Sequence, residues 1–167
     1  HIRLNLASAL PLGFISFAEM LDFWLNEPVD SLEILTRLQE ALPAELRILE
    51  LFPVSNALPS LQASLLSSDY KITLPEELML ESFQQKLEEL ISQPEIPITR
   101  RNKVVDYKPL IHEHPLLSDD SGMLTLEIRL SSTPQRNARP DDLLVRLGVD
   151  PADCVIERIR LNFSIEE

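Results

Sequence analysis

In the stretch MLTLEIRL, residues 123–130, apolar and polar side chains alternate from Leu124 onward. A period of two residues is typical of a β-strand, because successive side chains of a strand point to opposite faces of a sheet. The apolar side chains would face a core, and the opposite face would carry Thr125, Glu127 and Arg129. The stretch therefore predicts a strand that is buried on one side and open to solvent on the other.

The segments around this strand predict the order strand–helix–strand–strand–helix–strand. The expected elements are a strand at 70–74, a helix from Pro75 to about residue 92, an extended segment at 97–111, the strand at 123–130, a helix from Pro140 that Gly148 ends, and a strand at 155–163. This order is the split βαβ plan, which is also called ferredoxin-like. In the last strand we expect Val155, Ile159, Leu161 and Phe163 on the core side, and Arg158, Arg160 and Asn162 on the opposite face.

The first part of the chain predicts a strand at 21–25, a helix at 30–42 and a strand at 46–52. Asp30 and Glu33 have the spacing of a helix capping box. The expected fold class is therefore α+β, with two ferredoxin-like units in tandem. Residues 1–58 would form the first unit and residues 59–167 the second. The first is expected to be N-terminally incomplete, with its opening strand and helix before His1.

Composition excludes several kinds of site. The three glycines lie too far apart for a phosphate-binding loop, and Cys154 alone cannot make a disulfide framework, a Cys-rich zinc site or an iron–sulfur cluster. The formal net charge of −12 does not suit a protein that coats nucleic acid with its whole surface. Residues 1–95 carry a net charge of −10 and residues 96–167 only −2, so any anion that the chain binds is expected on the second unit. No apolar run is long enough to span a membrane, and the single cysteine favours a cytoplasmic location.

Several ordered phrases of the sequence resemble one known family. They are HIRLNLASALPLGFISFAEMLD (1–22), DSLEILTRLQEALPAELRILE (30–50), SLQASLLSSDYKITL (60–74), RRNKVVDYKPLI (100–111) and ARPDDLLVRLGVDPADCVIERIRL (138–161). The chain resembles an uncharacterised bacterial domain found beside or fused to radical S-adenosylmethionine (radical-SAM) proteins. The resemblance implies a radical-SAM partner. This chain lacks the Cys-x3-Cys-x2-Cys of such an enzyme, so no cofactor is expected here. Any S-adenosylmethionine and iron–sulfur cluster would belong to the partner.

His112 and His114 are the candidate metal ligands. In an extended segment two imidazoles at i and i+2 share a face, and Asp119 or Asp120 would supply a third ligand. Pro115 and the polar residues that follow favour a solvated loop instead, so no metal site is assigned.

Basic residues are the candidate ligand-binding groups. They are Arg100, Arg101, Lys103, Arg129, Arg136, Arg139, Arg158 and Arg160. On an open sheet face such cations can bind an anion or an acidic partner surface. The alternative is that they pair with nearby acids such as Glu127 and Glu157. The strands carry no aromatic platform for stacking bases, which disfavours an RNA recognition motif but leaves local phosphate contacts open.

The sequence contains no convincing catalytic constellation, and we leave open whether the chain is an enzyme. The leading hypothesis is a non-catalytic accessory or substrate-presenting module that works with a radical-SAM enzyme. The alternative is an RNA-contacting module that uses the local arginine clusters. A weaker alternative is a small metal-dependent enzyme centred on His112 and His114.

Overall fold

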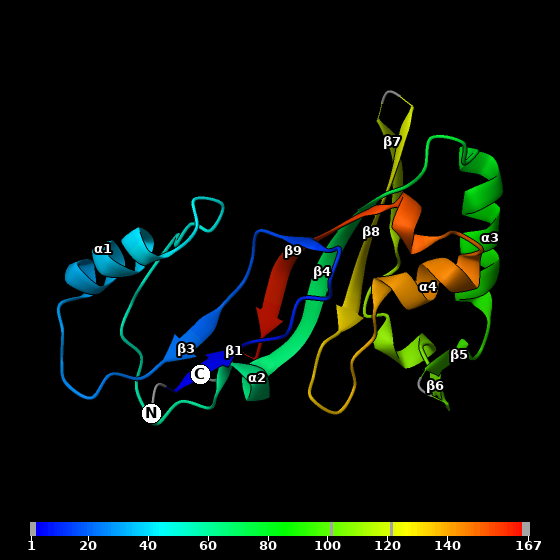
Figure 1. Ribbon diagram of the computed structural model, residues 1–167. Helices are drawn as coiled ribbons and strands as arrows, with labels where there is room; N and C mark the ends of the chain where they lie inside the picture. The colour runs from blue at the N-terminus through cyan, green and yellow to red at the C-terminus, as the bar shows by residue number, and fades with distance from the viewer. Residues whose placement is uncertain (1–2, 101, 121, 165–167) are drawn as a thin grey trace.

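A five-stranded sheet organises the fold (Figure 1). The computed structural model describes residues 3–100, 102–120 and 122–164. The strand order across the sheet is β2-β9-β4-β8-β7, and neighbours are antiparallel except for β2, which pairs with β9 in parallel. The strands are β2 (Ile15–Ser16), β4 (Leu65–Thr73), β7 (Leu116–Asp120), β8 (Met123–Ser131) and β9 (Val155–Phe163). The chain is thus a mixed α+β protein.

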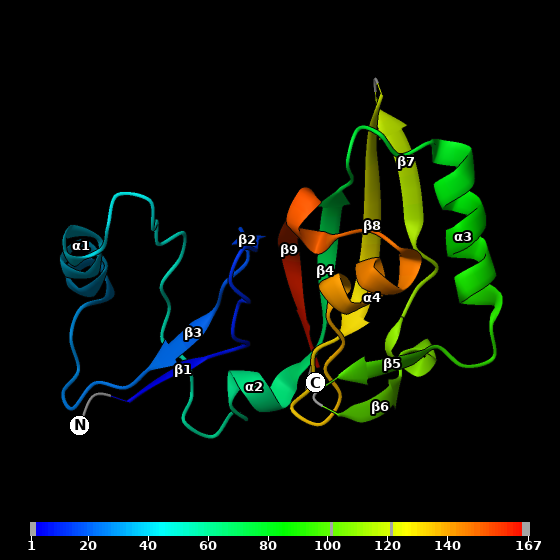
Figure 2. The same cartoon turned by 45° about the vertical axis from the view of Figure 1, so that its right-hand side comes forward.

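Two helices cover one face of the sheet, as Figures 1 and 2 show. They are α3 (Leu80–Ser92) and α4 (Pro140–Leu147). Pro140 occupies the first turn of α4, and Gly148 ends the helix with a φ of 80°, in the left-handed region that glycine adopts without strain. The strand predicted at 123–130 and the helix from Pro140 to Gly148 are confirmed. The other helix also forms, but it begins at Leu80 and not at Pro75. No helix in the described ranges is long and apolar enough to cross a membrane.

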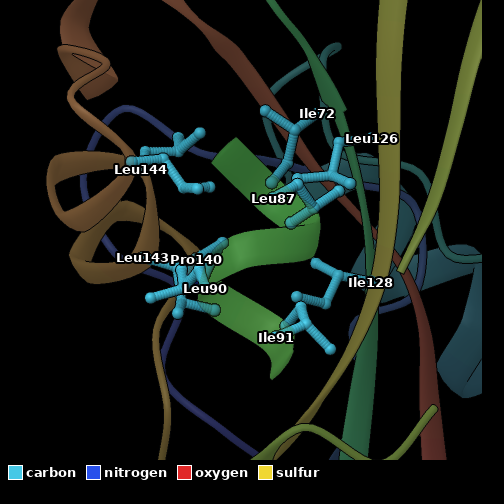
Figure 3. A pocket seen from close by; sticks show the side chains of 10 residues that line it. Ile72, Leu87, Leu90, Ile91, Leu126, Ile128, Pro140, Leu143 and Leu144 are labelled. Atoms are coloured by element: carbon cyan, nitrogen blue, oxygen red, sulfur yellow. The ribbon is translucent and has the colours of Figure 1, made fainter. Parts of the chain in front are cut away.

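The main core lies between these helices and the sheet. Apolar side chains from α3, α4, β4 and β8 meet around a void of about 10 Å³, which Figure 3 shows. A space of this size holds at most one water molecule. Its lining has no polar surface, so it is a packing gap in the core and no ligand site.

A hairpin and a short 3₁₀ helix replace the single extended segment expected at 97–111. Strands β5 (Pro97–Arg100) and β6 (Lys103–Asp106) pair only with each other, and a short 3₁₀ helix, η1 (Lys108–Leu110), follows. The strand that follows α3 in the five-stranded sheet is instead β7, which lies at the edge of the sheet and pairs with β8. The polar residues after Pro115 favour a loop, but residues 116–120 form strand β7. An edge strand tolerates polar side chains because one of its sides faces solvent.

The alternation of core-facing and outward-facing side chains in β9 is interrupted near the middle of the strand. Tyr70 of β4 pairs with Arg158, whereas Asp69 pairs with Arg160, so Ile159 is an extra residue in β9. Such a bulge shifts the alternation of side chains by one position. Arg158 therefore shares the core face with Tyr70, and Arg160 shares the open face with Asp69. The prediction that both arginines face outward is wrong for Arg158.

The same shift changes which apolar residues of β9 are buried. Ile156 is buried, whereas Val155 and Ile159, both expected in the core, are 46% and 40% exposed. Leu161 is buried as expected, in a smaller cluster with Ala7 and Leu65.

The N-terminal segment covers Arg158. The guanidinium is 1% exposed, and it donates hydrogen bonds to Glu19 at 2.5–2.9 Å and to the backbone carbonyl of Ser8 at 3.1 Å. The backbone carbonyl of Arg158 accepts from the Phe17 N–H at 3.2 Å. A long-range ion pair thus ties residues near the start of the chain to the last strand.

The remaining N-terminal elements stand apart from the main core (Figures 1 and 2). They are β1 (Leu4–Leu6), β3 (Leu21–Phe23), α1 (Ser31–Ala41) and α2 (Leu61–Ser64). β1 and β3 form a two-stranded antiparallel sheet. Asp30 caps α1 as predicted, by accepting from the backbone N–H of Leu32 and Glu33. None of the α1 residues is buried.

The strand predicted at 46–52 does not form. No strand among the residues that the structure describes pairs with this segment. The side-chain amide of Gln39 instead bonds to its backbone, donating to the carbonyl of Leu46 and accepting from the N–H of Ile48, both at 3.0 Å. An isolated extended segment has no ladder to complete, so its apolar pattern alone could not make it a strand.

Candidate functional site

The open face of the sheet carries a cluster of interacting polar side chains. Its members, hereafter the sheet-face cluster, are Ser67, Asp69, His112, Glu113, Arg129, Ser131 and Asn162. The β4–β8 register places Asp69 opposite Arg129 and Ser67 opposite Ser131. Asn162 of β9 pairs with Ser67 on the other side of β4. Three adjacent strands and the segment before β7 thus bring these groups together.

Asp69 is the acceptor at the centre of the cluster. Its carboxylate accepts two hydrogen bonds from Arg129, at 2.6 and 3.0 Å, and one from the side-chain amide of Asn162 at 2.8 Å. Burial raises the pKa of Asp69, but these hydrogen bonds and the charges of Arg129 and Arg160 outweigh it, so the pKa lies below its usual value. Asp69 is therefore held as a carboxylate.

This pKa direction predicts a pH-dependent contribution to stability. A carboxyl whose pKa is lowered in the folded state stabilises it above the unfolded pKa, near 4, and loses that effect as pH falls through the folded pKa. We therefore expect Asp69→Asn to be clearly less stable than the parent protein at pH 7, by about 1 kcal/mol, and the difference to shrink towards pH 2. Urea denaturation at several pH values measures this. A difference that stays constant with pH would contradict the assigned role of the carboxylate.

Arg129 joins two carboxylates across the face. It pairs with Glu113 as well as with Asp69. The hydrogen bond to Asp69 is the main reason that the pKa of Arg129 is raised. Its guanidinium therefore pairs with acids of the same chain. This agrees with the alternative that the basic residues pair with nearby acids, although the acids are Asp69 and Glu113 and not Glu127 or Glu157.

His112 contacts a serine that the sequence did not connect with it. Nε2 of His112 lies 2.7 Å from Oγ of Ser131. Ile111 forms a β-bridge with Leu130, and the backbone N–H of His112 donates to the carbonyl of Arg129. These backbone contacts place residues 111–112 beside the end of β8, which brings His112 to Ser131. A serine and a histidine 19 residues apart carry no local motif that could reveal this pair.

The two candidate metal ligands have different partners. His114 lies 3.4 Å from Glu88, on α3, whereas His112 contacts Ser131. Within the described ranges, no three His, Cys, Asp or Glu side chains come together as metal ligands would. Asp119 accepts from the backbone N–H of Gly122 and so shapes the β7–β8 turn.

A second polar site lies at the end of the sheet, between η1 and the loop before α4. We call it the rim cleft; its volume is about 300 Å³, and its lining consists of Val105, Asp106, Pro109, Leu110, Gln135, Arg136 and Asn137. The loop is held in place by its own bonds. The Arg136 N–H donates to the Thr133 hydroxyl, which donates to the Arg136 carbonyl, and Asn137 bridges to Ser132.

A buried tyrosine links the rim cleft to α4. Tyr107 is fully buried, and its hydroxyl donates to Asp142 at 2.5 Å and accepts from the backbone N–H of Arg139. Burial and the bond to Asp142 raise the pKa of Tyr107 well above its usual value. Arg139 pairs with Asp141, which raises the pKa of Arg139. Tyr107 thus stays neutral and positions the start of α4.

The structure separates the predicted basic residues into paired and unpaired groups. Those with a carboxylate within 4.0 Å are Arg100, Arg129, Arg139 and Arg158. Those without one among the described residues are Lys103, Arg136 and Arg160. Arg101 lies outside the described residues. Arg160 stands on the open sheet face, whereas Lys103 and Arg136 belong to the rim.

Comparison with known proteins places the chain in a family without assigning a function. A family model described as "Uncharacterized protein conserved in bacteria (DUF2344)" matches residues 1–140. None of the curated proteins matches the chain.

Proposed function

The chain belongs to the DUF2344 family of uncharacterised bacterial proteins, and we propose that it is a non-catalytic accessory or substrate-presenting module that works with a radical-SAM enzyme. The resemblance of the sequence to a radical-SAM-linked domain suggests the partner. The observation that carries the binding role is the open sheet face, where polar groups from three strands hold one another in fixed positions. Groups that are ordered before a ligand arrives lose little entropy on binding. Such a face suits recognition of a partner or substrate.

The protonation states of the cluster favour binding over catalysis. A general base works best when its pKa lies near the operating pH, and enzymes raise the pKa of carboxyl groups to achieve this. The pKa of Asp69 moves in the opposite direction. His112 contacts the Ser131 hydroxyl, but no carboxylate among the described residues accepts a hydrogen bond from its ring to orient it as a base.

In this proposal S-adenosylmethionine and the iron–sulfur cluster belong to the partner. A cluster needs several cysteine thiolates, and this chain has one cysteine. Burial, together with the nearby charges of Asp153 and Asp150, raises the pKa of the Cys154 thiol to about 11, which disfavours the thiolate that a cluster binds. The residues present therefore do not fit a cluster.

The proposal extends to the fold. For residues 59–167, the order β9-β4-β8-β7 with two helices on one face supports a ferredoxin-like unit. For residues 1–58 the support for such a unit is weaker, because the strand predicted at 46–52 does not form and β2 pairs with β9 of the main sheet.

The partnership is tested by measuring binding of this chain to the radical-SAM protein encoded beside it or fused to it. We expect a complex, and we expect Arg160→Ala to weaken it threefold to tenfold, on the order expected for one interfacial charge. Arg160 is exposed on the open face and has no ion pair among the described residues. Arg146→Ala is the matched control, because Arg146 is an exposed arginine on α4, which packs on the other face of the sheet.

A second readout separates presentation from catalysis. Removing the chain from the complex is expected to lower product formation while leaving substrate-independent cleavage of S-adenosylmethionine unchanged. If no complex forms and the activity does not depend on the chain, the proposal is wrong. Equal weakening by the Arg160 and Arg146 variants would exclude the open face as the contact surface.

A further inference from the structure

The rim cleft is a separate candidate for ligand binding, and the proposed function does not use it. Its volume of about 300 Å³ lies at the lower end of the range for small-molecule sites. Its walls come from η1, β6 and a loop whose backbone is bonded to itself. Hydrogen bonds within the loop hold one wall of the cleft, and its size suits one small ligand.

The mouth of the cleft is basic. Arg136 is exposed in its lining and has no ion pair among the described residues. Lys103 is also exposed and stands two residues before Val105, so both side chains lie on the same face of β6. Arg100 stands behind this mouth, donating to the Asn137 carbonyl at 3.2 Å. Free cations on an acidic chain attract a phosphate group.

The interior of the cleft combines apolar walls with hydrogen-bonding groups. Val105 and Pro109 supply the exposed apolar surface, since Leu110 is only 3% exposed, and Gln135 and Asn137 are exposed polar residues of the lining. The lining also contains one acid, Asp106, whose Oδ1 accepts from the backbone N–H of Ile96 and Lys108. These bonds fix the carboxylate, and its other oxygen can accept from an amino group of a ligand.

We propose that the rim cleft binds one nucleotide unit, with the phosphate at Arg136 and Lys103 and the base between the apolar wall and the amides. A nucleobase presents a flat apolar face and an edge of donors and acceptors, which matches this mixture of groups. A free nucleotide and one unpaired nucleotide of an RNA strand share this chemistry. The inference is independent of the radical-SAM partnership.

Calorimetric titration of the full chain at low salt tests the proposal, with the four nucleoside 5′-monophosphates, the parent nucleosides, inorganic phosphate and a short single-stranded RNA as probes. We expect at least one monophosphate to bind at least tenfold more tightly than its nucleoside or inorganic phosphate, and its affinity to fall as salt rises. Arg136→Ala should weaken it about tenfold, the loss of one charge-assisted hydrogen bond. Gln135→Glu, which adds a negative charge to the lining, should weaken it as well.

Arg146→Ala is the matched control and should leave the affinity unchanged, because Arg146 lies on α4 outside the lining. Thermal melting of each variant shows whether it is folded. RNA that binds at least tenfold more tightly than the mononucleotide identifies a strand as the source, and equal affinities identify free nucleotide. The proposal is overturned if no nucleotide binds, if inorganic phosphate binds as tightly, or if the Arg136 and Arg146 variants lose affinity equally. None of these results bears on complex formation with the partner enzyme.

Discussion

Replacing Leu144 with alanine is expected to lower the free energy of unfolding by about 3 kcal/mol. Leu144 of α4 is fully buried and lines the void between the helices and the sheet, with Ile72 and Leu126 across from it (Figure 3). The substitution removes apolar surface from the core and enlarges a gap that α4 cannot close, because α3 and the sheet hold its neighbours in place. Urea denaturation followed by circular dichroism measures the change.

The next residue along α4 provides the control. Val145 is 64% exposed, so Val145→Ala should change the stability by less than about 0.5 kcal/mol. Similar losses for the two variants would mean that α4 does not pack through Leu144, and the described core would be wrong.

Replacing Glu19 with glutamine is expected to destabilise the protein by about 3 kcal/mol, because it leaves the buried guanidinium of Arg158 without its carboxylate. Arg158 is 1% exposed, and Glu19, at 35% side-chain exposure, is its only ionic partner among the described residues. The double variant Glu19→Gln/Arg158→Met should recover much of the loss, since it also removes the uncompensated charge. Chemical denaturation of the three proteins measures both effects.

An exposed ion pair of the same chain serves as the comparison. Arg37 and Glu33 pair on α1 with side chains that are 72% and 57% exposed, so Glu33→Gln should change stability very little. A loss at Glu19 no larger than the loss at Glu33 would contradict the description of Arg158 as buried beneath the N-terminal segment.

The elements that the sequence predicted well are those with a strong local signal. The alternation of residues 123–130 predicted β8, and Pro140 and Gly148 bounded α4, because each pattern is read within one element. Asp30 predicted the start of α1 for the same reason. The strand predicted at 46–52 does not form, and the extended segment predicted at 97–111 is only partly correct, because a strand needs a neighbour and local sequence does not name it.

The candidate site was predicted less completely than the fold. The basic residues were identified, but the sequence could not say which of them acids would occupy. The pairs Asp69–Arg129 and Glu19–Arg158 join residues 60 and 139 positions apart. Ser131 and His112 likewise meet only because Ile111 bridges to the end of β8.

By itself the sequence determined the α+β class, the buried side of β8 and the limits of α1 and α4, since periodicity and capping act between residues close in the chain. The tertiary structure alone decided which arginines are free. One extra residue, Ile159, reverses the alternation of β9 and turns Arg158 towards the core while Arg160 stays on the open face. The physical reason is that strand register is set by hydrogen bonds to another strand, so a local pattern cannot reveal a bulge in that pairing.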